Sequence, residues 1–178
     1  GTITIGTGGT LDTGTGGLTV GGSGGEPATL DTAGTVNCAG LTVNSGGDIA
    51  NSGTNTINVS GSLYISGTYS TPSSGKIVMT GGGVNLYSAV TLGDLTINSA
   101  GTVSLITGAL SVGGDLTISS GTLDTGSQNL TVTGLTDIDD TLTFSNTDGN
   151  DVLDLNGNLD ADGTLTLTGA ADGRFSGT

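Results

Sequence analysis

Several residue types on which catalysis and ion pairing depend are scarce or missing in this chain of 178 residues. It has no histidine, no tryptophan, two prolines, and two cationic side chains against 16 acidic ones, for a net charge of −14. So few cations argue against a nucleic-acid partner, because the phosphate backbone is bound through lysine and arginine. No apolar run approaches the roughly 20 residues that span a bilayer, so no membrane insertion is expected.

The single cysteine, Cys38, has no partner in the chain, so no internal disulfide can form. In the stretch TVNCAG it alternates with Val36, and we expect it to be a small buried apolar residue. The chain begins at Gly1 rather than at methionine. We therefore expect either a processed mature product or a piece of a longer protein.

Glycine and threonine dominate what is present, and threonine alternates with leucine, isoleucine and valine. The pattern is clearest in the stretch 114–134, GDLTISSGTLDTGSQNLTVTG, where SSG and GSQ separate three short alternating segments. Neighbouring side chains of a strand point to opposite faces. The residues expected on the inner face are Leu116, Ile118, Leu123, Leu130 and Val132. The residues expected on the outer face are Thr117, Thr122, Asp124 and Thr131.

A short signature, Leu-x-Val or Leu-x-Ile, recurs along the chain and indicates an internal repeat. It begins at Leu18, Leu41, Leu63, Leu95 and Leu116. The intervals are 21 to 23 residues, except for one of 32 residues after Leu63. No window shows a helical apolar period. The fold class predicted is all-β: a single-domain parallel β-solenoid over 1–178, of about eight coils of 20–23 residues. The long interval predicts an irregular inserted region at about 68–93.

The final part of the chain, about 137–172, replaces outward threonine with aspartate and asparagine. From Leu153 onward in DVLDLNGNLDADGTLTLTG, leucine and alanine keep to odd-numbered positions and the acids and amides to even-numbered ones. Because the period of two persists, we expect strands to continue through this acidic part.

Three stretches, KIVMTGG, LGDLTINSAGTVSL and ALSVGGDLTISSGTLDTGSQNLTVTG, resemble the Gly/Thr-rich repeats of large bacterial surface proteins. The similarity is to filamentous-haemagglutinin-like adhesins and to autotransporter-passenger-like stalks, and it is closest over residues 76–134. It implies a right-handed parallel β-helix in a structural protein that is secreted or held at the cell surface. It supplies no site residues.

Carboxylates are the main candidates for chemistry. NTDG at 146–149 and the pair Asp139–Asp140 resemble motifs of β-helical polygalacturonases, but the spacing differs and the histidine and cations of such sites are missing. We therefore expect no enzyme. The alternative that stays open is a carbohydrate-binding or carbohydrate-cleaving β-helix, with surface glycans as ligands. Tyr64, Tyr69 and Tyr87 could then stack on sugars, or they could be packing residues.

Calcium is the one metal that the sequence suggests. Asn158, Asp160 and Asp162 match the first half of an EF-hand loop, although its twelfth position is Gly169 instead of glutamate. These three residues are the calcium candidates, and the alternative is a solvated acidic face. No other cofactor is expected.

Thr-x-Thr pairs and glycosylation sequons also occur, and both patterns can arise without any function. Thr-x-Thr pairs, such as Thr141/Thr143, resemble the flat arrays of ice-binding solenoids, but threonine is also a favoured outward strand residue. Asn58 and Asn129 begin glycosylation sequons, which occur often by chance in such a chain.

The two ends predict the partner. The first strand, TITI at 2–5, carries no charge, and the tail GRFSGT is too short for a helical cap. Unblunted strand edges favour pairing with another chain. We therefore expect either copies stacked end to end in an extracellular filament or neighbouring repeats of a longer stalk.

Overall fold

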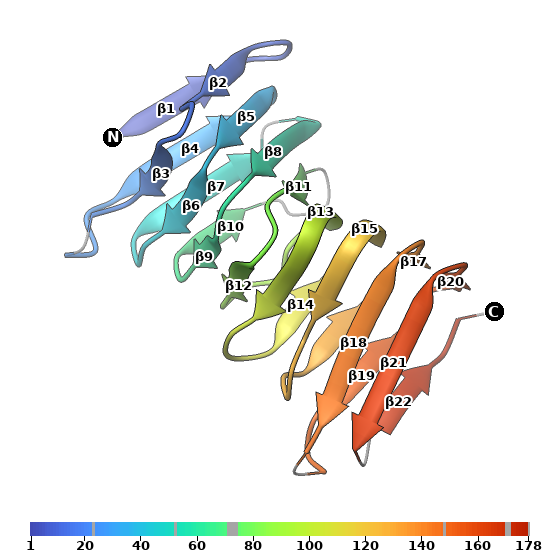
Figure 1. Ribbon diagram of the computed structural model, residues 1–178. Coiled ribbons are helices and arrows are strands. Elements are labelled where there is room, and N and C mark those ends of the chain that lie inside the picture. Colours follow the sequence, from blue (N-terminus) through green and yellow to red (C-terminus); the bar gives the residue numbers. More distant parts are fainter. Residues whose placement is uncertain (23, 52, 71–74, 148, 170–171, 178) are drawn as a thin grey trace.

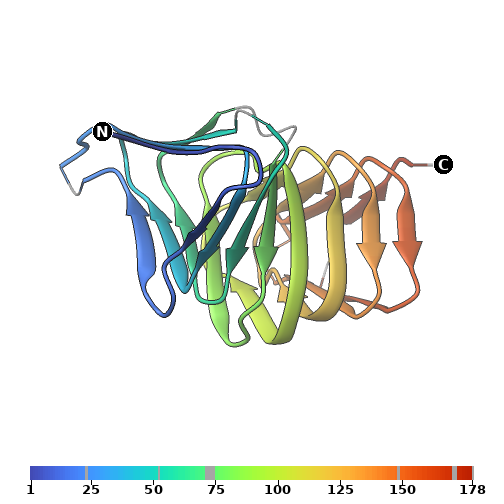
Figure 2. The same cartoon turned by 90° about the horizontal axis from the view of Figure 1, so that it is seen from above.

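The chain winds into an elongated stack of short parallel strands (Figure 1). The computed structural model describes residues 1–22, 24–51, 53–70, 75–147, 149–169 and 172–177. Every regular element in these ranges is a strand, which confirms the all-β solenoid. No helix in the same ranges is long and apolar enough to cross a membrane. In Figure 2 the first residue and the last lie at opposite ends of the stack.

Most coils place a strand or part of a strand on each of three sides. The first continuous side stacks β2 (Thr10–Asp12), β5 (Thr35–Cys38), β8 (Asn55–Val59), β11 (Gly75–Met79), β13 (Asp94–Leu105, first half), β15 (Leu116–Asp124, first half), β17 (Thr136–Ile138) and β20 (Leu159–Ala161). The second continuous side stacks β3 (Gly17–Val20), β6 (Gly40–Val43), β9 (Leu63–Ile65), β12 (Val84–Ser88), the second halves of β13 and β15, β18 (Thr141–Asn146) and β21 (Thr164–Gly169). Seven successive pairings on each of these sides make about seven turns.

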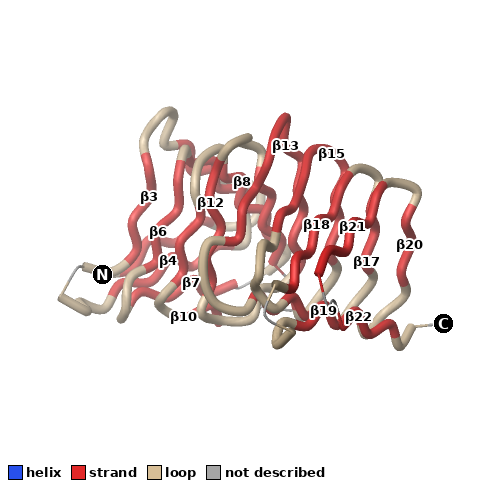
Figure 3. The backbone as a smooth tube through the Cα atoms, turned by 60° about the horizontal axis from the view of Figure 1, so that its bottom comes forward, coloured by secondary structure: helices blue, strands red, loops and turns tan. Residues whose placement is uncertain are grey.

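The remaining side, here called the split side, is made of two separate sheets. The first contains β1 (Thr2–Ile5), β4 (Ala28–Thr32), β7 (Gly47–Asn51) and β10 (Thr68–Ser70). The second contains β14 (Leu110–Val112), β16 (Leu130–Val132), β19 (Val152–Leu155) and β22 (Asp172–Phe175). Between the two sheets the chain makes one parallel bridge, from Leu92 to Val112. Figure 3 shows β7, β10, β19 and β22 along the same edge of the molecule.

The core is a thin column of inward side chains stacked residue on residue. The five residues expected on the inner face of 114–134 are all buried, and the four expected on the outer face are partly exposed. Cys38 is buried as expected. Because parallel strands pair in register, Leu116 lies between Leu95 and Thr136. Each coil therefore completes the burial of the coils above and below it.

The SSG stretch is a bend within one strand, whereas the sequence suggested a break between two. β15 runs through it, with Gly121 at a φ of +82°. A Cβ atom on Gly121 would lie 2.5 Å from the carbonyl oxygen of Gly101 in the coil below. Only glycine combines that positive φ with so close an approach. The coil can therefore turn a corner without losing its ladder to β13.

The 32-residue interval after Leu63 has a different origin from an inserted loop. Leu63 pairs with Leu86 on the second continuous side, whereas Leu95 pairs with Ile77 on the first. The recurring signature thus changes side between its third and fourth occurrences. The register step from Ile77 to Leu95 is 18 residues, shorter than the 20 from Ile57 to Ile77. The described parts of 68–93 form β10, β11 and β12, all in regular parallel register.

Strands continue through the acidic final part, as the period of two indicated. Leu153 and Leu155 are fully buried, but Leu159 and Leu167 are 38% and 40% exposed. The register of β20 and β21 on buried strands shows that these residues still face inward. They are exposed because no further described strand lies over β20 or β21.

Candidate functional site

The calcium candidates lie on the last strand of the first continuous side. Asp160 is the middle residue of β20 and pairs in register with Asp137 of β17. Asn158 precedes β20, and its carbonyl oxygen accepts a hydrogen bond from the backbone N–H of Thr136 at 2.8 Å. Desolvation, followed by the nearby charges of Asp139, Asp160 and Asp162, raises the pKa of Asp137.

The described residues contain no group of three or more acidic, histidine or cysteine side chains that could hold a metal ion. The geometry that is present is a ladder of carboxylates that repel one another. Calcium binding stays a prediction, and melting temperatures measured in calcium and in a chelator would test it.

Other aspartates act as backbone acceptors between coils. The Asp94 carboxylate accepts a hydrogen bond from the N–H of Asp115 at 3.0 Å, and the Asp115 carboxylate accepts one from the N–H of Leu135 at 2.7 Å. Asp140 accepts one from the N–H of Gly121 at 2.7 Å. Each contact satisfies a donor that the strand ladder leaves open at a corner. These acids therefore hold successive coils in register.

The three tyrosines do not form one cluster. Tyr64 and Tyr87 lie next to each other on the outside of the second continuous side, with ring centroids 4.4 Å apart and planes 24° apart. Tyr69 is buried in the core. Because the first two rings cover one another's faces, the pair supports the packing reading of the tyrosines more than it supports a sugar platform.

The threonine pairs align over only two neighbouring coils. Thr141 and Thr143 of β18 lie in register with Thr164 and Thr166 of β21. On the preceding coil the position of Thr143 is taken by Asp124. The flat regular face that ice-binding solenoids require is therefore confined to one end of this side.

The two sequon asparagines both use their side chains in hydrogen bonds between coils. Asn58 donates from Nδ2 to Oδ1 of Asn37 at 2.8 Å. Oδ1 of Asn129 accepts from the N–H of Val152 at 2.6 Å. A glycan is attached at Nδ2, so on Asn58 it would share the atom that makes this contact, whereas on Asn129 it would leave the accepting Oδ1 in place.

Cys38 does not offer a nucleophile. Its side chain is buried, and desolvation raises the pKa of the thiol to about 11. The adjacent surface depression, of about 280 Å³, is lined by Gly14, Asn37, Asn58, Ser60 and Thr80 as well as by Cys38. No charged side chain lines it, so it holds no carboxylate for acid–base chemistry.

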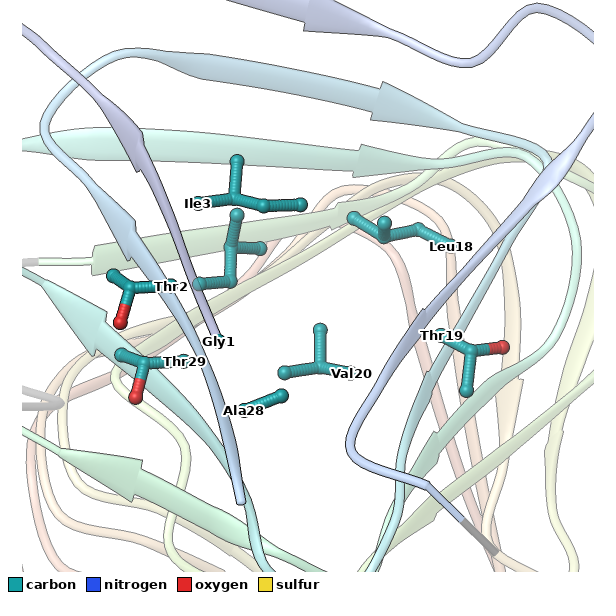
Figure 4. Close-up of a pocket in the computed structure, with 9 residues that line it drawn as sticks. Gly1, Thr2, Ile3, Leu18, Thr19, Val20, Ala28 and Thr29 are labelled. Atoms are coloured by element: carbon teal, nitrogen blue, oxygen red, sulfur yellow. The ribbon is translucent and has the colours of Figure 1, made fainter. Parts of the chain in front are cut away.

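The strongest unsatisfied surfaces are the two ends of the solenoid. At the first coil a cavity of about 290 Å³ opens between β1, β3 and β4, and Ile3, Leu18, Val20, Ala28 and Leu30 are its apolar lining (Figure 4). Ile3 is 52% exposed. At the other end, Phe175 of β22 is 48% exposed, and Leu159 of β20 and Leu167 of β21 are also exposed. Interior side chains at the same inward positions are fully buried.

Sequence reasoning anticipated the open strand at 2–5 but missed the end formed by the tail. The sequence predicts only that GRFSGT is too short for a helical cap and predicts no strand there, yet β22 pairs in register with β19. The alternation that could have revealed it is short and is interrupted by Gly173. Comparison of the chain with protein-family models, with curated proteins and with solved structures finds no match.

Proposed function

We propose that this chain is a structural unit of an extracellular assembly, stacked end to end in a surface filament or in the stalk of an adhesin. The observation that carries the proposal is the pair of open ends. At each end the backbone N–H and C=O groups of one strand edge on every side lack a ladder partner among the described strands. Apolar side chains that face inward are exposed at the same two places.

Stacking another unit on an end would pair the open backbone groups and bury the exposed apolar side chains. Unpaired strand edges are templates for a further strand. Burial of exposed apolar surface contributes roughly 25 cal/mol per Å². Because the two ends are different surfaces, their contact is head to tail, and a contact of this kind that does not close into a ring extends into a fibre.

The composition and the resemblance to surface-protein repeats favour a place outside the cell. The side walls carry threonine, serine and aspartate, and the net charge of −14 keeps such walls soluble and apart. The described side chains pack in the core and form hydrogen bonds between coils. A structural rod requires these two kinds of contact.

Blocking one end tests the proposal. Ile3→Lys places a charge on the inward row of β1, where Ile3 is already half exposed, so the coils beyond it keep their packing. We expect the variant to shorten the particles seen by light scattering and in electron micrographs, with little change in thermal unfolding. Adding Ile5→Pro should shorten them further, because proline removes a backbone donor.

The matched control is Ile106→Lys, which makes the same change at a residue that is 45% exposed between β13 and β14, away from both ends. This control should assemble like the parent chain. The proposal fails if the parent chain stays monomeric at high concentration, or if both lysine variants shorten the particles equally.

A further inference from the structure

The path of the chain begins and ends on the same side of the solenoid. β1 opens the path on the split side, and β2 and β3 follow on the first and second continuous sides. At the other end β20 and β21 occupy the two continuous sides, and the chain then returns to the split side as β22, on top of β19. From β1 to β22, the described path therefore contains one strand position more than a whole number of coils, with the Leu92 bridge counted as a position on the split side.

We propose that successive units in the end-to-end stack are rotated by one side, about a third of a turn, so that β1 pairs with β20, β2 with β21 and β3 with β22. This inference rests on the proposed function and adds the geometry of its contact. After β22, the next open position on the winding path lies over β20, on the first continuous side. The first strand of the next unit, β1, fills that position without a break in the path.

The unrotated arrangement leaves a mismatch. If β1 of the next unit pairs with β22, then β2 and β3 stand one layer too high above β20 and β21. That layer is about 4.8 Å, the spacing of neighbouring strands, so two of the three ladders stay open. If β2 pairs with β20 instead, β1 and β22 require the same place.

Apolar side chains match in the rotated arrangement. Ile3 faces inward, because its register partner Leu30 is buried, and it can lie over the exposed Leu159. Val20 of β3 also faces inward, and it can lie over Phe175 of β22. Val20 lines the cavity at the first coil. The aromatic ring of one unit would thus meet the cavity of the next (Figure 4).

Charges discriminate between the two arrangements as well. Leu11 of β2 must face inward, as its buried partner Val36 does. If β2 lay on β20, aligning Leu11 with an inward residue would place Asp12 opposite either Asp160 or Asp162. Like charges directly opposite on paired strands are destabilising.

On β21 the outward residues are threonines, so Asp12 meets no acid there. The rotation also places Thr4 opposite Asp160, and Thr19 opposite Arg174, when the inward rows are aligned. The rotated stack therefore sets no acid of β1, β2 or β3 against an acid of the strand below it.

Disulfide trapping distinguishes the two geometries. In a Cys38→Ala background, one unit carries Thr4→Cys or Asp12→Cys, and the other carries Asp160→Cys or Asp162→Cys; all four residues are exposed. Register partners on neighbouring strands lie within the Cα separation of 4.4–6.8 Å that a disulfide allows. We expect the mixture of Thr4→Cys with Asp160→Cys to give most of the chain as oxidised dimers, and both mixtures containing Asp12→Cys to give tenfold less.

The outcomes separate this inference from the proposed function. Preferential linkage through Asp12→Cys overturns the rotation while the head-to-tail contact stands. Particles that assemble without linkage through Thr4→Cys also overturn it. A parent chain that neither assembles nor links overturns both. The helical symmetry of unmodified fibres in electron micrographs measures the rotation between successive units independently. We expect a rotation of about a third of a turn per unit.

Discussion

At the scale of single residues, the inward ladders stack mostly like on like, and one ladder of the first continuous side has a single polar member. The ladder there runs through Ile57, Ile77, Leu95, Leu116, Thr136 and Leu159. Thr136 is fully buried, and its Oγ1 has no hydrogen-bond partner among the described atoms. A buried hydroxyl without a partner keeps its full desolvation cost.

Thr136→Val should therefore stabilise the fold, because it removes the hydroxyl and keeps the branched shape. We expect a gain of about 1–2 kcal/mol in the free energy of unfolding. For a chain of this size that is a rise in melting temperature of about 2–4 °C per kcal/mol. The control is Thr117→Val, on the outward face of β15, which should change little. A loss of stability on Thr136→Val would show that the hydroxyl has a partner.

At the scale of elements, the first continuous side changes character toward its end. Its outward residues include Asp94 and Asp115, which bind backbone donors, and then Asp137 paired with Asp160. The raised pKa of Asp137 means that the folded state disfavours its charged form. The stability associated with the protonated group is thus fully present below the ordinary pKa of 3.8 and is lost as pH rises through the folded value.

Asp137→Asn should remove that loss, so the variant should be more stable than the parent at pH 7 and equal to it near pH 3. Denaturant unfolding at the two pH values measures the difference. The control is Asp154→Asn on β19, whose register partner is Arg174. Because this partner is a cation and not an acid, the change relieves no like-charge repulsion along the ladder and should bring no gain at pH 7. Equal stabilisation by both variants would attribute the effect to net charge alone.

At the scale of the whole molecule, the acids govern how rods meet side by side. With a net charge of −14 and an isoelectric point of about 4.1, the side walls repel one another at neutral pH. This repulsion acts over a Debye length of about 10 Å at 0.1 M salt and about 3 Å at 1 M salt. The proposed end-to-end contacts would rest on strand pairing and apolar burial, which salt does not weaken.

Raising the salt concentration from 0.05 to about 1 M should therefore bring separate filaments together into lateral bundles without shortening them. Lowering the pH toward the isoelectric point should have the same effect, because the carboxylates become protonated. Electron micrographs at each condition measure filament width and length. Filaments that shorten in salt would show that their junctions depend on charge pairs.

The residue pattern alone determined the all-β fold and which side chains point inward. Leu116, Leu123 and Val132 alternate with polar residues, and in a strand such alternation assigns faces whatever the rest of the chain does. Burial of Cys38 followed from the same period.

Only the tertiary structure decided which strands stack on which. The signatures at Leu63 and Leu95 look alike, yet they lie on different sides, because stacking depends on the summed lengths of strands and corners between them. The exposure of Leu159 and Phe175 likewise depends on the absence of a further described coil above them. The local alternation of residues predicts neither the stacking of strands nor the exposure at the ends. Both depend on the complete path of the chain.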